Sequence, residues 1–271
     1  MTPDPSLTAA RSSAASWPFV AGVSAIVMSP LLMVTTGMSA LYNLWLAVMM
    51  IGLWVAQRLT KREVGIAVGD PGSYAMAVAY VAGIVGAVAL GAWASQLIDL
   101  KDYSAATVFR RLSLNFLITF ALALITEEGF FRGALWGSCE RAGFSPVTTM
   151  IWTSVAFGLW HVAVPLIDPD FAQPLSKVPQ YAIGSAVFGV AMGLLRLRSG
   201  SIVVPSFCHA LWNASTYTFF GAGEKKGQLG IADPTVWDPE RGYAGLLLAA
   251  LVAALMWWWV GPQRARRTAL S

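Results

Sequence analysis

Long apolar runs separated by short polar segments make up most of the chain. They are close to the roughly twenty residues that an α-helix needs to cross the hydrocarbon core of a bilayer. Because the runs are continuous and do not alternate, they are typical of membrane helices and not of barrel strands. The pattern predicts an all-α, polytopic transmembrane helical bundle of about eight spans. These lie at residues 17–36, 39–57, 73–97, 112–136, 147–166, 178–197, 201–220 and 243–260.

The sequence predicts one transmembrane bundle with a polar tail at each end. Residues 1–16, rich in Ser, Ala and Pro, are predicted to be a disordered cytoplasmic tail, and residues 262–271 a basic cytoplasmic tail. Residues 17–261 form a single transmembrane bundle whose catalytic core lies at about 112–220. The first apolar run is too long for a signal-peptide core, so we expect an uncleaved first helix. The longest connection, 221–242, is a solvated loop or, alternatively, a gate over a cavity.

Composition and charge agree with a membrane protein. Of 271 residues, 56% are hydrophobic and 12% charged, and the mean hydropathy is +0.61. A soluble domain is nearer one quarter charged. The basic residues cluster in the loops at 58–62 and 196–198 and in the tail at 264–267, so both termini are predicted to be cytoplasmic. The net charge of +4 is explained by this topology, and no nucleic-acid partner is expected. The two cysteines, Cys139 and Cys208, are interpreted as small core residues.

Two adjacent carboxylates, Glu127 and Glu128, follow an apolar run of membrane length. A charged side chain in hydrocarbon costs roughly 2.5–3.5 kcal/mol on insertion scales. On a helix, Glu128 and Arg132 are separated by four residues and can form an ion pair. Glu127 points about 100° away from Glu128, so it must find another partner or remain a reactive group.

Both histidines of the chain also lie in predicted spans. Phe157 lies one helical turn before His161, and Asn213 one turn after His209. Polar groups of this kind are too costly to face lipid, so we expect them to converge in the bundle interior. Straight helices place His161 roughly 20 Å from the inner surface, and Glu127 and His209 nearer 10 Å. Tilt, kinks at Gly158 or Pro205, or a later start of the span that carries His161 must therefore bring them together.

These motifs resemble those of the CPBP family of intramembrane proteases, which includes the CAAX prenyl endopeptidases and the bacteriocin-immunity or Abi-like proteins. The resemblance rests on Glu-Glu-x-x-x-Arg at 127–132, Phe-x-x-x-His at 157–161 and His-x-x-x-Asn at 209–213, on successive helices. Phe-Arg-Gly-x-Leu at 131–135 and Arg-x-Gly-Ser-Ile at 198–202 agree with it. It covers about residues 112–220. It implies an integral protein of a bacterial or archaeal cell membrane, acting on a membrane-associated or prenylated or otherwise lipidated peptide.

Peptide hydrolysis needs an activated water, a hold on the carbonyl oxygen and a proton for the leaving amine. Glu127 suits a general base, and His161 can hold the same water and move its proton. His209 and Asn213 can donate hydrogen bonds to the oxyanion. Glu128 and Arg132 are predicted to brace the helix behind the catalytic residues, with Phe157 beside His161. The resemblance implies the same division of roles.

Other chemistries remain open. No cofactor is favoured, but a zinc version would use Glu127, His161 and His209 as ligands with an open water position. The sequence contains no H-E-x-x-H motif. A serine or cysteine mechanism through Ser206 or Cys208 is less favoured, because Cys208 and His209 face different ways on a helix. The rival functions are a non-catalytic immunity or adaptor protein and a proton-coupled transporter.

Overall fold

The computed structural model describes residues 5–168, 171, 173–222 and 225–268. The helices are α1 (Pro5–Thr36), α2 (Ser39–Gln57), α3 (Lys61–Val64), α4 (Pro71–Ala94), α5 (Ala105–Ile125), α6 (Leu135–Arg141), α7 (Pro146–Trp160), α8 (Val164–Ile167), α9 (Val178–Ser199), α10 (Val203–Phe219) and α11 (Tyr243–Thr268). A π-helix, η1 (Gly129–Ala134), joins α5 to α6, and a short 3-10 turn, η2 (Leu175–Lys177), precedes α9. Strands β1 (Gly221–Ala222) and β2 (Lys225–Lys226) pair antiparallel.

The predicted all-α polytopic bundle is confirmed. In the described part of the chain, seven helical segments are long and apolar enough to cross a membrane: Ser16–Thr36, Ser39–Gln57, Pro71–Ala94, Ala105–Arg141, Pro146–Ile167, Leu175–Ser199 and Tyr243–Val260. The span expected at 201–220 is present as the shorter helix α10, of 17 residues. The molecule is therefore an integral membrane protein with seven long spans and one shorter helix, where about eight spans were predicted.

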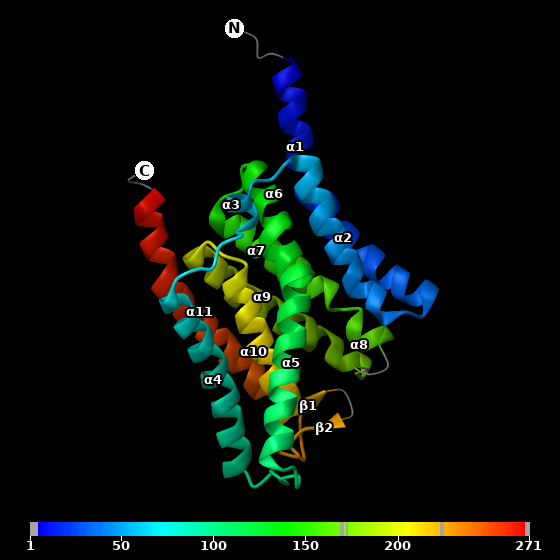
Figure 1. Cartoon of the computed structure of the whole chain (residues 1–271), viewed down its shortest axis with the longest axis vertical. Helices are drawn as coiled ribbons and strands as arrows, with labels where there is room; N and C mark the ends of the chain where they lie inside the picture. The colour runs from blue at the N-terminus through cyan, green and yellow to red at the C-terminus, as the bar shows by residue number, and fades with distance from the viewer. Residues whose placement is uncertain (1–4, 169–170, 172, 223–224, 269–271) are drawn as a thin grey trace.

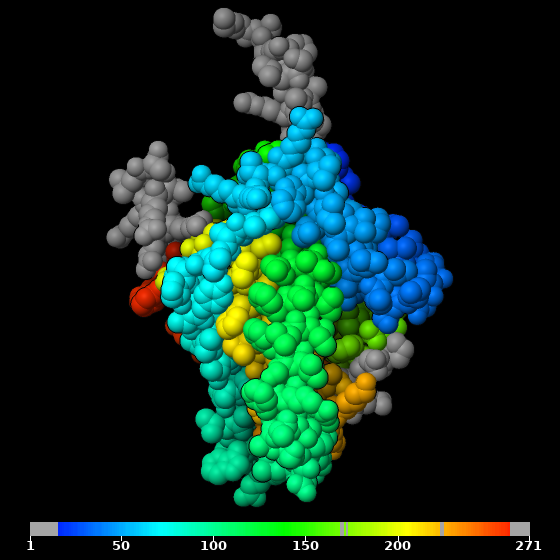
Figure 2. All heavy atoms as spheres, in the orientation of Figure 1, coloured from blue at the N-terminus to red at the C-terminus, as the bar shows by residue number. Residues whose placement is uncertain are grey.

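The arrangement of the helices agrees with an even number of crossings. Helix α1 begins and α11 ends at the same end of the bundle, which also holds α3 and the turn between α9 and α10 (Figure 1). The connection between α4 and α5 and the β1–β2 hairpin lie at the opposite end. On the face shown in Figure 2, α5 runs between α4 and α2. The assignment of the end that holds both termini to the cytoplasm stays a prediction, which rests on the basic residues.

Polar residues at the helix starts explain several boundaries. The side chains of Asp70, Ser104 and Ser145 each accept a hydrogen bond from the third backbone N–H that follows, which caps α4, α5 and α7. Proline follows the cap in α4 and α7, where its missing N–H costs nothing. Helix α1 begins at Pro5, within the segment predicted to be a disordered tail, and α11 continues to Thr268, within the predicted basic tail. The Ala-rich composition of residues 5–16 favours helix over disorder.

The longest span changes its helix type at the carboxylate pair. Thr126 departs from helical geometry (φ −114°, ψ −90°), and η1 follows before α6 resumes the α-helix. Gly129 is required here, because an added Cβ would lie 2.4 Å from the carbonyl oxygen of Leu124. Single π turns are frequent at functional sites. Because of this break, regular α-helix geometry does not give the directions in which Glu127 and Glu128 point.

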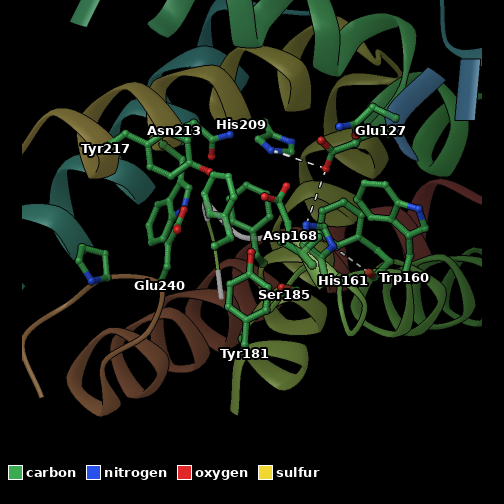
Figure 3. Close-up of a pocket in the computed structure, with 18 of the residues that line it drawn as sticks. Glu127, Trp160, His161, Asp168, Tyr181, Ser185, His209, Asn213, Tyr217 and Glu240 are labelled. Carbon is green, nitrogen blue, oxygen red and sulfur yellow. Dashed lines mark hydrogen bonds and ion pairs between the residues drawn. The ribbon is translucent and has the colours of Figure 1, made fainter. Parts of the chain in front are cut away.

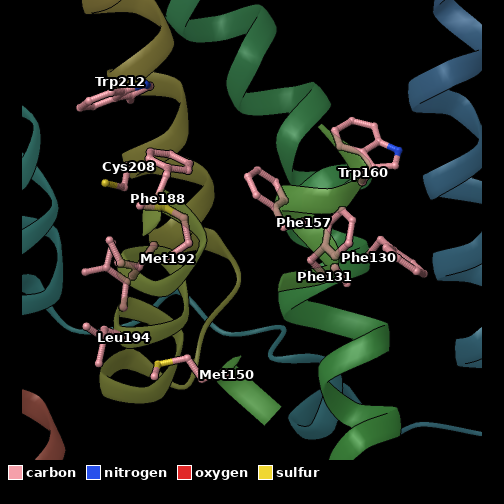
Figure 4. Packing of buried hydrophobic residues seen from close by; sticks show 14 of the residues in the cluster. Phe130, Phe131, Met150, Phe157, Trp160, Phe188, Met192, Leu194, Cys208 and Trp212 are labelled. Carbon is pink, nitrogen blue, oxygen red and sulfur yellow. The ribbon is translucent and has the colours of Figure 1, made fainter. Parts of the chain in front are cut away.

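Small residues bring α7 and α9 into close contact. A Cβ on Gly158 would lie 2.7 Å from the carbonyl oxygen of Ala182, and one on Gly189 would lie 3.1 Å from Cα of Ser154. Close backbone approach through small residues is the usual way in which membrane helices associate. Figure 4 shows the adjoining core, in which Phe157, Trp160 and Phe131 gather on one side and Phe188 and Trp212 on the other. This packing fixes the end of α7, where His161 follows.

The predicted mismatch in depth is resolved by helix boundaries and not by kinks. The span that carries Glu127 continues to Arg141, so Glu127 lies 14 residues before that end, and His161 lies 15 residues after the start of α7 at Pro146. Both are therefore about 20 Å from the same end. The turn between α9 and α10 is attached to the segment around Gly65, because the amide of Ile202 donates to the carbonyl oxygen of Gly65 at 2.9 Å.

Candidate functional site

A cavity of about 350 Å³ lies inside the bundle, and all the candidate catalytic residues line it. Its walls come from α2, α4, α7, α8, α9, α10 and α11, from Glu127 between α5 and η1, and from the connecting residues His161, Asp168, Phe171, Pro239 and Glu240. Figure 3 shows Glu127, His161 and His209 on one side of the cavity, and Tyr217 and Glu240 on the other. The expectation that the polar groups in the spans converge in the bundle interior is therefore confirmed.

Glu127 lies between the two histidines. Its Oε2 atom is 3.9 Å from Nε2 of His161 and 3.9 Å from Nε2 of His209. The oxygen is buried and has no hydrogen-bond partner among the described residues. A gap of this size lets a water molecule bridge two atoms with ordinary hydrogen bonds. Glu127 can therefore share a water with His161, and the same holds for its gap to His209.

His161 is oriented by its own helix. It is the last residue of the α7 turn, and its Nδ1 lies 2.9 Å from the carbonyl oxygen of Phe157. Because a carbonyl only accepts, Nδ1 carries the proton and Nε2 presents its lone pair to the cavity. The ring of Phe157 packs on the imidazole at a centroid distance of 4.3 Å. The predicted pairing of Phe157 and His161 is therefore present.

Glu128 and Arg132 form the predicted ion pair, at 3.4 Å between Nε and Oε2, and both side chains are fully buried. The guanidinium also donates to the carbonyl oxygen of Gly189 at 2.9 Å and lies 4.5 Å from the centre of the Phe157 ring. Glu128 has a second partner that was not predicted, because Nδ1 of His209 donates to its Oε1 at 2.9 Å. The bracing pair thus directly orients a candidate catalytic histidine.

Asn213 lies one turn after His209 on α10 and also lines the cavity. Tyr217 follows at the next turn, and Tyr181 of α9 and Glu240 complete the wall away from Glu127 (Figure 3). The side chains of His209 and Asn213 can therefore reach a carbonyl group that enters between them and Glu127. Their assignment to the oxyanion stays a prediction.

Two functional features were missed by the sequence reading. Arg196 was assigned to a basic loop, yet it is 5% exposed and donates to the carbonyl oxygens of Arg132 and Glu63 at 2.9 Å. Glu240 was placed in a polar connection, yet it lines the cavity. Its sequence neighbours, Pro239 and Arg241, gave no signal of burial, because a loop has no periodicity that marks an inward face.

The geometry of the trio bears on a metal site. Zinc ligands at 2.0–2.2 Å in tetrahedral geometry are about 3.4 Å apart, whereas Glu127 is 3.9 Å from each histidine nitrogen. Within the described residues, no group of three or more His, Cys, Asp and Glu side chains has the arrangement to hold a metal ion. The metal-free site stays a prediction.

Ser206 and Cys208, the candidates for a serine or cysteine mechanism, lie outside the cavity wall. The hydroxyl of Ser206 donates to the carbonyl oxygen of Ile202 at 2.7 Å. The thiol of Cys208 is buried and faces the carbonyl oxygen of Ala77 at 3.8 Å. Cys139 is likewise buried and free, as expected of a core residue.

Comparison with known proteins gives one match. Residues 109–215 match the family described as type II CAAX prenyl endopeptidase Rce1-like. The matched segment agrees with the range of about 112–220 over which the motifs resemble that family, and it contains Glu127, His161, His209 and Asn213. No curated protein and no solved structure matches the chain.

Proposed function

We propose that the chain is a metal-free endopeptidase acting on a membrane-associated or lipidated peptide, and the match of residues 109–215 to the Rce1-like type II CAAX prenyl endopeptidases supports this. The observation that carries the proposal is the position of Glu127, whose unpartnered Oε2 lies 3.9 Å from both His161 and His209 in a buried cavity. A carboxylate and an imidazole around one water are the groups that general-base hydrolysis requires.

In the first step, Glu127 and His161 hold a water between Oε2 and Nε2. The water oxygen attacks the peptide carbonyl carbon while Glu127 takes one of its protons. The negative charge that develops on the carbonyl oxygen needs donors placed in advance. The amide group of Asn213 is one. His209 is the other when it carries both ring protons, a state that the Glu128 carboxylate at 2.9 Å from Nδ1 stabilises.

In the second step, the tetrahedral intermediate collapses. The bond between carbonyl carbon and nitrogen breaks, and Glu127 returns its proton to the leaving amine. The products are a new carboxyl terminus and a new amino terminus, and Glu127 is again a carboxylate. Arg132 and Glu128 do not touch the substrate in this scheme, because both are fully buried behind His209.

The test is cleavage of a synthetic peptide by the purified protein in liposomes. The same peptide is offered with a prenyl group, with an acyl chain and without any lipid, each with and without a strong chelator. We expect cleavage of the lipid-bearing forms and no effect of the chelator. Activity that is lost with chelator and restored by zinc would establish the zinc version of the site, and preferred cleavage of the lipid-free form would refute the substrate class.

A non-catalytic immunity or adaptor function is the alternative. It makes no use of an unpartnered buried carboxylate, so Glu127→Gln should leave such a function intact. Under our proposal the same substitution abolishes activity while the protein still folds and inserts, which separates the two classes.

A further inference from the structure

Glu240 stands on the cavity wall away from Glu127 and has no role in the proposed chemistry (Figure 3). Its Oε1 accepts a hydrogen bond from Nε1 of Trp212 at 2.8 Å and one from the hydroxyl of Thr216 at 3.4 Å. Both donors belong to α10, which also carries His209 and Asn213. These bonds hold the carboxylate at a defined position relative to the candidate catalytic residues.

The second oxygen of Glu240 lacks a comparable partner. Both donors reach Oε1, and Oε2 receives no hydrogen bond from the described residues and is not among the buried atoms without one. It is therefore accessible from the cavity that the side chain lines. The guanidinium of the neighbouring Arg241 is engaged by another carboxylate, that of Asp238, at 2.7 Å.

Most ionisable groups of the cavity wall are acidic. Glu127, Asp168 and Glu240 line it, no lysine or arginine is among the described lining residues, and His209, which can carry a positive charge, lies beside Glu127 and Glu128. Around Glu240 the wall is aromatic, formed by Tyr181 and Tyr217 (Figure 3) and by Trp212, which donates to Glu240. Aromatic faces attract cations, and the attraction grows when the cation is desolvated. The wall around Glu240 therefore complements a positive group.

The free protein leaves this carboxylate poorly compensated. Burial, reinforced by the negative charge of Asp238, raises the pKa of Glu240 to about 7. A cation beside Oε2 would offset this cost, because an opposite charge within about 4–6 Å favours the ionised form.

We propose that Glu240, with the rings of Tyr181 and Tyr217, forms a subsite that binds a lysine or arginine side chain of the peptide substrate near the cleaved bond. The inference rests on the proposed function, since it assigns the specificity of that same cavity. Glu240 selects the peptide by charge, whereas Glu127 and His161 act on the bond. A peptide with an acidic residue at the same position is expected to be the poorest substrate.

The test uses lipid-anchored peptides that differ at one residue. Lysine, glutamine or glutamate is placed in turn at each of the three positions on either side of the cleaved bond. At one position, kcat/KM for lysine should exceed that for glutamine by about tenfold or more, and glutamate should be worse still. In Glu240→Gln, whose amide oxygen can still accept from Trp212, the lysine-to-glutamine ratio should fall to about one.

The matched control is Asp233→Asn, which removes one negative charge from an exposed residue of the same connection and should retain the lysine preference. Binding of the same peptides to the inactive Glu127→Gln protein gives a second readout that needs no cleavage. The ratio of dissociation constants should show the same preference, and adding Glu240→Gln should abolish it. If lysine is not preferred in binding, or if the preference survives Glu240→Gln, the subsite is refuted. If binding shows it but wild type cleaves no peptide, the proposed function fails and the subsite stands.

Discussion

Replacing Arg132 by methionine should destabilise the protein far more than replacing an exposed arginine. Arg132 is fully buried and makes its ion pair with Glu128 at 3.4 Å, donates to the carbonyl oxygen of Gly189 and lies over the ring of Phe157. Methionine retains the length and packing of the side chain but removes the charge. Glu128 then remains as a buried carboxylate whose only other described partner is His209.

The expected size follows from breaking a buried ion pair. Losing one partner costs about 3–5 kcal/mol, because the remaining charge is left uncompensated. At about 2–4 °C per kcal/mol for a chain of this size, the midpoint of thermal unfolding should fall by about 6–20 °C. The control is Arg110→Met on α5, an exposed arginine, which should change stability by less than about 0.5 kcal/mol.

The assay is thermal unfolding in detergent, monitored as the loss of soluble protein. It compares wild type with Arg132→Met, Glu128→Gln and the double variant. Glu128→Gln removes the stranded charge, so the double variant Glu128→Gln/Arg132→Met should be more stable than Arg132→Met alone. The coupling between the two positions should be about 2–3 kcal/mol. An Arg132→Met protein that unfolds with the wild-type midpoint but is inactive would refute the bracing role and place Arg132 in the chemistry.

Three further predictions concern other parts of the molecule. Asn213→Ala should lower kcat by about 10²–10³ with little change in KM, because one oxyanion donor is lost; a change confined to KM would instead indicate substrate binding. Reporter fusions at the C-terminus and within 227–242 should report opposite sides of the membrane, as the even number of crossings requires, and the same side for both would contradict it. Hydrogen bonding from Arg141 lowers the pKa of Glu63 to about 2 from 4.5. The stability that this pair contributes should therefore be present above pH 4.5 and lost as the pH falls towards 2. Arg141→Gln should flatten that part of the stability curve, and an unchanged slope would show that the pair contributes nothing.

The fold, and the meeting of the polar residues of the spans at one cavity, were largely predictable from the sequence. Apolar run length is a direct consequence of bilayer thickness, so the spans could be found from the sequence pattern alone. The separation of four between Glu128 and Arg132, and between His209 and Asn213, fixed which side chains share a face. The cost of charge in hydrocarbon then required these groups to meet in the interior, and they line one cavity.

The parts that were missed depend on contacts between distant segments. The π-helix at Gly129–Ala134 requires Gly129 to pass the Leu124 carbonyl, which periodicity does not reveal. The contact of His209 with Glu128 joins residues 81 positions apart and depends on how α10 packs against the span that carries Glu128. Glu240 lies in a connection, where no sequence pattern marks which side chain faces a cavity.

The most direct test of the central claim is single-turnover hydrolysis of one lipid-anchored peptide in liposomes by wild type and by Glu127→Gln, with insertion and thermal unfolding measured on the same preparations. A glutamine in place of Glu127 retains the size of the side chain but cannot take a proton from water. We expect wild type to cleave the peptide and the folded Glu127→Gln protein to lose nearly all of the rate, as happens when one member of a catalytic unit is removed. Cleavage by Glu127→Gln at close to the wild-type rate would contradict the assignment of Glu127 as the base that activates the water.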